Sequence, residues 1–360
     1  MNNKKSSTVA IVTMFFLFAM VAFITNLAAP FGNIWGYKYS WAGMMGNMMN
    51  FAAYLFMGIP AGKMLTTVGY KKTSLIALGV GFVGLLVQYV SSIAGADVAV
   101  FNYGGQTVAL NLIIYLLGAF ISGFCVCMLN TVVNPMLNTL GGGGNKGNQL
   151  VQTGGSLNSL TATLTPFLVG VLVGTVNEGT SMNDVTPLLF IGMGVFLIAF
   201  LIISRVTVPE PALERARAEA ASGQPKVKDK YSAWSFRHFV LGAVAIFFYV
   251  GIEVGIPGEL NFYLSQPADK GGIGFEGSAA IAGTLVSVYW LLMLVGRVLS
   301  GVISGKVSTR TQMISVSSLA IVLLLVAILL PDSATMAFKG GNVPVKCLFI
   351  VLCGICTSIM

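Results

Sequence analysis

The chain has 360 residues with a formal net charge of +8; 9% of the residues are charged and 56% are hydrophobic. Soluble proteins carry about 25% charged residues, so this composition leaves too few charges to cover a soluble surface and excludes a soluble enzyme. The mean hydropathy of +0.85 is that of a chain embedded in a lipid bilayer.

Long uncharged runs follow one another along the chain. Residues 9–37 and 98–145, for example, contain no Lys or Arg. A bilayer core needs roughly 20 apolar residues per helix, and lipid offers no hydrogen-bond partner to an irregular backbone, so we expect α-helical spans. The predicted spans are residues 9–30, 42–64, 73–94, 109–139, 149–176, 186–204, 237–264, 278–304, 311–330 and 345–360.

One extended hydrophilic stretch separates six spans from the remaining ones. It covers residues 206–236 and contains three prolines, as a cytoplasmic linker between two membrane halves would. We therefore expect a first six-helix half at 1–205 and a second, incomplete half at 237–360. The last span stops without a polar tail, so the sequence predicts an all-α membrane protein truncated to about 10 of 12 spans.

The basic residues are distributed unevenly about these spans. With the N-terminus in the cytoplasm, fifteen of the 20 Lys and Arg residues fall on cytoplasmic segments, four fall on the opposite side, and Arg297 lies inside a span. This is the positive-inside pattern of a multi-pass protein. The net charge therefore indicates topology, with the lipid bilayer as partner and no nucleic acid.

A G-x-x-x-G-K pattern ends two of the predicted spans, at residues 58–63 and 301–306. Small residues four apart allow two helices to approach closely. The copies occupy matching positions six spans apart, which indicates duplicated halves with a substrate site between them, as in secondary transporters. The expected cytoplasmic gate loop comprises Gly62, Lys63, Lys71 and Lys72.

Polar side chains recur inside the fourth and fifth spans. Asn130, Asn134 and Asn138 follow at i, i+4 and i+8, which places three amides on one helical stripe. Gln152 belongs to a similar stripe in the fifth span, with Asn158 beside it. Amides both donate and accept hydrogen bonds. The stripes predict contact with a neutral polyhydroxylated ligand, with hydrogen bonding between helices as the structural alternative.

One carboxylate lies deep in the seventh span, at Glu253. Ionised there, it would cost roughly 2.5–3.5 kcal/mol, so we expect it to be protonated, paired or exposed to a water-filled cavity. Asn261 shares its helical face, and Pro257 between them favours a bend or break. For Arg297 in the eighth span, snorkelling to the cytoplasmic interface is favoured over pairing with a carboxylate.

Motifs for enzyme chemistry are missing from the sequence. The glycine run at 141–144 lacks the G-K-[ST] ending of a phosphate loop, and His238 is the only histidine. We therefore expect no catalytic residues, no metal and no cofactor.

The sequence resembles the major facilitator superfamily, and within it the fucose:proton symporter family, which includes bacterial glucose/galactose transporters. The resemblance covers essentially the whole chain. It is carried by Phe15-Phe-Leu-Phe18, Ile59-Pro-Ala-Gly62, Gly69-Tyr-Lys-Lys72, Asn130-Thr-Val-Val-Asn134-Pro135, Gln152-Thr, Leu157-Asn-Ser159, Tyr249-Val-Gly-Ile-Glu253, Gly296-Arg297 and the terminal Gly354-Ile-Cys-Thr-Ser-Ile-Met360.

Two departures from the family pattern bear on ion coupling. The family's proton symporters carry an Asp where this sequence has Asn26 and a Glu where it has Asn130. An amide cannot titrate, so Glu253 remains the only deep carboxylate that could couple transport to protons. Sodium coupling and uncoupled facilitated diffusion both stay open.

These features predict a monomeric secondary transporter of a neutral hexose, such as glucose, galactose or fucose, in a bacterial inner membrane. An exporter of drugs or metabolites and a non-translocating sugar sensor are the alternatives. The expected sugar-binding residues are Asn26, Asn130, Asn134, Gln152, Asn158, Glu253 and Asn261.

Overall fold

The computed structural model divides the chain into two compact units. Unit 1 comprises Met1–Gly143 and Leu160–Gln224, and unit 2 comprises Gly144–Ser159 and Pro225–Met360. The structure describes residues 2–39, 41–173, 179–211, 213–214, 218, 231–265, 272–273, 278–338 and 340–359.

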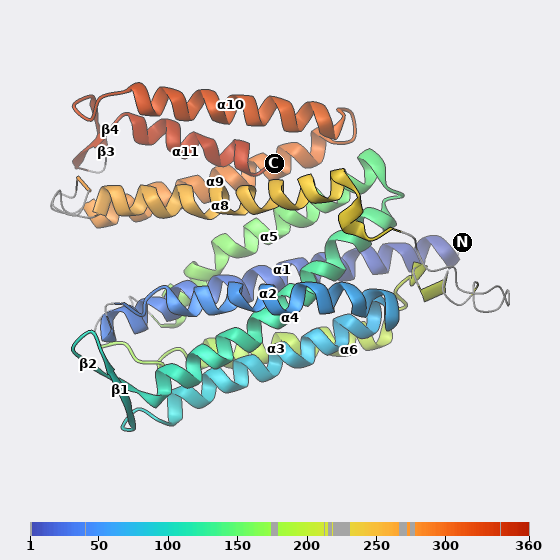
Figure 1. Cartoon of the computed structure of the whole chain (residues 1–360), viewed down its shortest axis with the longest axis horizontal. Coiled ribbons are helices and arrows are strands. Elements are labelled where there is room, and N and C mark those ends of the chain that lie inside the picture. Colours follow the sequence, from blue (N-terminus) through green and yellow to red (C-terminus); the bar gives the residue numbers. More distant parts are fainter. Residues whose placement is uncertain are drawn as a thin grey trace. The chain divides into compact units, whose positions relative to one another are not determined.

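Unit 1 is a helical bundle built around α4, which packs against α1, α2 and α3, while α3 also packs against α6 (Figure 1). Helix α5 begins in unit 2 and ends in unit 1. The helices are α1 (Asn2–Lys38), α2 (Met45–Thr67), α3 (Gly69–Ile93), α4 (Leu110–Leu140), α5 (Gly144–Leu172) and α6 (Thr186–Arg205).

Helix α1 is longer than predicted, because it continues past Pro30 to Lys38. A proline inside a helix removes one backbone hydrogen bond. The turns beyond it bury Phe31 and Trp35, each 1% exposed, and the Trp35 ring lies 5.4 Å from the ring of Tyr115 on α4. Burial of these large rings offsets the cost of the proline.

In unit 2, α9 packs against α8 and α11, and α11 packs against α10. Its apolar core centres on Tyr289 of α9, which is fully buried with Leu285, Cys347 and Val351. The elements are η1 (Ala233–Ser235), α8 (Arg237–Ser265), α9 (Ser278–Ile303), α10 (Thr309–Leu329) and α11 (Lys346–Thr357).

Each unit has a β-hairpin between its third and fourth helices, which the sequence analysis did not predict. In unit 1, β1 (Ala99–Tyr103) pairs antiparallel with β2 (Gln106–Ala109). In unit 2, β3 (Thr335–Phe338) pairs with β4 (Gly341–Pro344). The hairpins occupy equivalent places between α3 and α4 and between α10 and α11, which supports the internal repeat.

An ion pair and a hydrogen bond link the β-hairpin of unit 2 to the end of α8. Asp332, just before the hairpin, pairs with Lys346 just after it and accepts a 2.6 Å hydrogen bond from the Tyr263 hydroxyl of α8. The Lys346 ammonium also lies 4.7 Å from the centre of the Tyr263 ring. The hydrogen bonds from Lys346 and Tyr263 hold the pKa of the Asp332 carboxyl below its usual value.

The described helices confirm the predicted all-α membrane fold, since ten of them coincide with the ten predicted spans. Seven are long and apolar enough to cross a bilayer; α2, α5 and the shorter apolar α11 are not among them. Large apolar side chains stand outward on several helices, such as Phe247 at 75% exposure and Leu329 at 81%, as lipid-facing residues do. The predicted linker falls mostly outside the described residues.

Candidate functional site

A buried ion pair joins α8 and α9 in unit 2. The Arg297 guanidinium donates from Nη2 to Glu253 Oε1 over 3.0 Å, and the two side chains are only 16% and 18% exposed. Tyr249, one turn earlier on α8, lies close to the Glu253 carboxylate. Glu253 is therefore a paired carboxylate, one of the three states expected from sequence. The snorkelling predicted for Arg297 is wrong, because its guanidinium turns toward this deep acid.

Arg297 also connects this pair to the first part of α5. Its Nη1 donates to Ser159 Oγ over 2.6 Å and to the Gly155 carbonyl over 3.3 Å. The arginine stem passes close to the α5 backbone, since a Cβ at Gly155 would lie in ordinary van der Waals contact with Arg297 Cδ, at 3.5 Å. One guanidinium thus ties three helices together through fixed, planar donors. We call Glu253, Arg297, Ser159 and Gly155 the arginine network.

The remaining predicted residues of unit 2 differ in exposure. Gln152 and Asn158 are half-buried on α5, while Asn261 is exposed on α8, two turns beyond Glu253. Helix α8 runs through Pro257 as one continuous helix, so the break considered at that proline is not formed.

The predicted amides of unit 1 make two kinds of contact. Asn130 Nδ2 donates to the Tyr54 hydroxyl of α2 over 2.8 Å and so bridges two helices. Asn26 and Asn134 instead donate to backbone carbonyls four residues earlier in their own helices, at 2.8 and 3.1 Å. Only the Asn130 amide therefore uses this bond to join a neighbouring helix.

Three residues that hold these contacts were not among the predicted site residues, namely Arg297, Ser159 and Tyr54. The signal for Arg297 was available, since a charge inside an apolar span usually has a partner. Ser159 and Tyr54 carried a weaker signal, since Ser159 lies on the polar stripe of the fifth span with Gln152, and Tyr54 lies in a span that also contains amide side chains. The predicted site residues are divided between the units, with Asn26, Asn130 and Asn134 in unit 1 and Gln152, Asn158, Glu253 and Asn261 in unit 2.

The two G-x-x-x-G-K copies differ in their surroundings. A Cβ added at Gly58 or Gly62 would meet no atom within 4 Å in the part of the chain that is described, so close helix packing does not explain these glycines. At Gly301 and Gly305 the nearest atoms belong to α5, at 3.6 and 3.5 Å. The close approach predicted for both copies is therefore not found at the first, and at the second a Cβ would meet α5 only at ordinary van der Waals distance.

The predicted gate loop contains one lysine with a defined role. The Lys71 ammonium donates to the Ser204 carbonyl at the end of α6 over 2.8 Å, whereas Lys63 and Lys72 are exposed. In return, the Glu210 carboxylate accepts from the backbone N–H groups of Tyr70 and Lys71 over 2.6 and 2.8 Å. These are first-turn N–H groups of α3, which have no partner within the helix.

We expect Glu210→Ala to lower the free energy of unfolding by about 0.5–2 kcal/mol, as loss of a helix cap does. The measurement is the melting temperature of the detergent-solubilised protein. Glu214→Ala is the matched control, because Glu214 lies one turn further along and is exposed. Equal melting temperatures for the two variants would contradict a capping role for Glu210.

The fold and these contacts define a class of protein. Ten described helices form two units with a repeated hairpin, and the apolar helices carry a largely buried ion pair and a bridging amide, Asn130. Charged and amide groups inside membrane helices mark solute or ion pathways, and repeated helical halves are the usual build of secondary transporters. The class is that of multi-pass membrane transporters.

The chain belongs to the Major Facilitator Superfamily, whose family model matches residues 9–360. It is 26% identical over 325 residues to the glucose/galactose transporter of Brucella abortus biovar 1 (strain 9-941), covering 88% of this chain and 71% of the relative. It is 28% identical over 343 residues to a putative glucose/galactose transporter of Helicobacter pylori (strain ATCC 700392 / 26695), covering 91% and 75%.

A solved structure of similar fold is that of the E. coli fucose:proton symporter, FucP. The two chains superpose with a TM-score of 0.72 at 17% sequence identity, covering 99% of this chain and 82% of the symporter. At this identity the likeness establishes the fold, and it agrees with the major facilitator architecture predicted from sequence.

Proposed function

We propose that the protein carries a neutral monosaccharide, a hexose such as glucose, galactose or fucose, across a membrane by alternating access. The observation that carries this proposal is the similarity, over 88% and 91% of the chain, to relatives named glucose/galactose transporters. The absence of charge on such a sugar suits the amides of α1, α4 and α5, which offer donors and acceptors without a net charge.

The proposed sugar-binding groups are the predicted ones, and their present contacts suggest how each would act. The Asn130 amide donates a hydrogen bond to the Tyr54 hydroxyl. A sugar hydroxyl would therefore replace this hydrogen bond between α2 and α4, or add a second one beside it. Asn26 and Asn134 have one amide hydrogen directed to their own backbone. Each keeps its carbonyl oxygen and a second N–H as bonding capacity for a hydroxyl. Gln152, Asn158, Glu253 and Asn261 complete the proposed set.

Glu253 is the proposed coupling residue. Protonation would remove the charge that Arg297 neutralises, and Arg297 is bonded in turn to Ser159 and Gly155 of α5. A proton on Glu253 would therefore alter the helix that carries Gln152 and Asn158. A coupling ion can shift the equilibrium between two states of the carrier only if it binds one of them more tightly than the other.

The proposed setting is the inner membrane of a bacterium, with the N-terminus in the cytoplasm and the protein as a monomer. The distribution of Lys and Arg supports this orientation, because positively charged segments stay on the cytoplasmic side. Neither an enzymatic activity nor a cofactor is part of the proposal.

The test is uptake of labelled glucose, galactose and fucose by the purified protein in lipid vesicles. Each sugar is followed with an imposed proton gradient, with a sodium gradient and with none, and protein-free vesicles serve as the blank. We expect uptake of at least one hexose, with accumulation above equilibrium when protons are supplied.

The other outcomes separate the alternatives. If uptake only reaches equilibrium under every gradient, the protein transports the sugar, but transport is not coupled to protons or sodium. Binding without uptake or exchange would favour a sensor. If no sugar binds and an organic cation such as ethidium is transported instead, the monosaccharide proposal fails and an exporter takes its place.

A further inference from the structure

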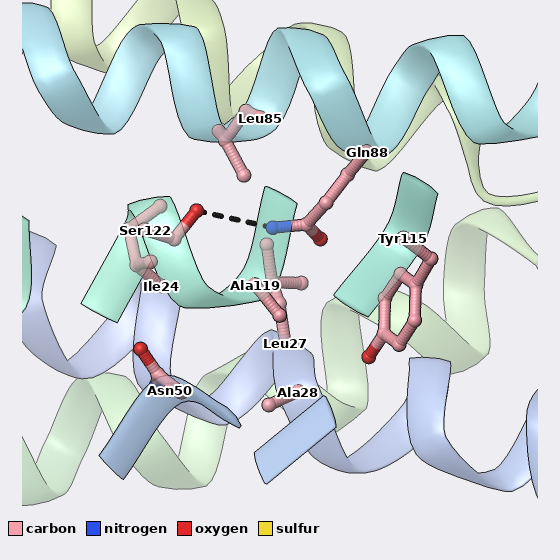
Figure 2. A pocket seen from close by; sticks show the side chains of 9 residues that line it. All are labelled: Ile24, Leu27, Ala28, Asn50, Leu85, Gln88, Tyr115, Ala119 and Ser122. Atoms are coloured by element: carbon pink, nitrogen blue, oxygen red, sulfur yellow. Dashed lines mark hydrogen bonds between the residues drawn. The ribbon is translucent and has the colours of Figure 1, made fainter. Parts of the chain in front are cut away.

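A small cavity lies inside unit 1, where α1, α2, α3 and α4 come together (Figure 2). Its volume is about 20 Å³, which accommodates roughly one water molecule. Apolar side chains of α1 and α3 form part of the wall. The polar part comes from Asn50 of α2, Gln88 of α3, and Tyr115 and Ser122 of α4.

One polar atom in this wall lacks a protein partner. Asn50 is 3% exposed, and its Oδ1 makes no hydrogen bond within the described part of the chain. Figure 2 shows that oxygen directed toward the space between α2 and the helices that carry Gln88 and Ser122. A buried acceptor without a partner is destabilising, and native proteins satisfy nearly all such groups with protein or ordered water.

The amide across the cavity is only partly used. Gln88 Nε2 donates to Ser122 Oγ over 3.1 Å, and both side chains are buried. A primary amide has two N–H groups and a carbonyl oxygen, so this bond uses one of its hydrogen-bonding sites. The wall therefore presents donors and acceptors together, from Gln88, Tyr115 and Ser122, opposite the Asn50 oxygen.

The wall cannot close to bring these groups into direct contact, because α4 already lies against its neighbours at glycines. A Cβ at Gly123 would collide with the Asn50 backbone carbonyl, and one at Gly118 would lie 2.9 Å from the Gly84 carbonyl. A Cβ at Gly84 would in turn lie 2.5 Å from Ser122 Oγ. Helices at this separation leave no room for further approach.

We propose that this cavity is a binding site for one ordered water molecule, which donates to Asn50 Oδ1 and links α2 to the α3–α4 pair. The volume fits one water, and the mixed donors and acceptors suit a ligand that both donates and accepts. A monovalent cation suits the wall less well, because the wall has no carboxylate and an amide N–H group takes part in it. The site lies within one unit and is independent of the proposed sugar transport.

The test is the sign of the stability change in Asn50→Leu, which replaces the amide by an apolar side chain of similar size. If a water satisfies Asn50 Oδ1, the variant expels it and leaves the Gln88 and Ser122 groups short of a partner. We then expect the melting temperature in detergent to fall by about 2–4 °C. Asn47→Leu is the control, since Asn47 lies three residues away on α2 and does not line the cavity.

A higher melting temperature for Asn50→Leu than for wild type would overturn the proposal, because it would mean that the oxygen is unsatisfied in the native protein. An unchanged melting temperature would overturn it too. If Asn50→Leu does not fold, an experimental density map of the wild-type protein decides. A peak within hydrogen-bond distance of Asn50 Oδ1 supports the water, and its absence refutes it. If sodium raises the melting temperature relative to choline in wild type but not in Asn50→Leu, the bound ligand is a cation and not a water molecule.

Discussion

Replacing Arg297 by glutamine is expected to cost about 3–5 kcal/mol of folding free energy, the range measured when one partner of a buried ion pair is removed. The variant would leave the Glu253 carboxylate, 18% exposed, without its cation. It would also lose the bonds from Nη1 to Ser159 and Gly155. The measurements are the melting temperature in detergent and the yield of monodisperse protein.

The control for Arg297→Gln is the double variant Glu253→Gln/Arg297→Gln. Two facing amides carry no net charge and can bond each other, so we expect the double variant to recover most of the lost stability. Arg297→Lys should stay destabilised, because one ammonium lacks the forked donors that reach α5 and α8 together. If the double variant is as unstable as Arg297→Gln, the loss does not come from an uncompensated Glu253 charge.

The helical framework was predictable because it depends on local composition. Each uncharged run must form a helix in lipid, and the ten predicted spans lie where the structure has helices. The ends were less predictable. The first predicted span ended at residue 30, but burial of Phe31 and Trp35 extends the helix to Lys38. The two β-hairpins, one between α3 and α4 and one between α10 and α11, were not predicted. Their strands are only four or five residues long and lie next to apolar spans.

The contacts of the candidate site were less predictable because they join residues far apart in sequence. Glu253 could be recognised as a costly carboxylate, but its partner Arg297 is 44 residues away, and the network also reaches Ser159. The sequence placed Asn134 on a polar stripe and Asn26 among the predicted sugar-binding residues. It could not show that each amide donates to a carbonyl of its own helix, a local choice open to any short polar side chain.

The largest functional effect is expected for Glu253→Gln, which retains the size of the side chain and an oxygen that can accept from Arg297 but cannot take up a proton. If Glu253 is the coupling residue, vesicles containing this variant should no longer accumulate sugar above equilibrium in a proton gradient. Exchange of labelled for unlabelled sugar should persist, because exchange needs the carrier to reorient with sugar bound and needs no net proton movement. The two assays are run on the same vesicles.

Glu259→Gln provides the matched control, since Glu259 lies six residues further along α8 and is exposed. It should accumulate sugar as wild type does. Loss of both accumulation and exchange in Glu253→Gln would mean that the residue is needed for binding or folding, and the melting temperature separates those two cases. Full accumulation by Glu253→Gln would exclude Glu253 as the proton carrier. Because Asn26 and Asn130 cannot titrate, coupling would then have to use sodium or a group outside these helices.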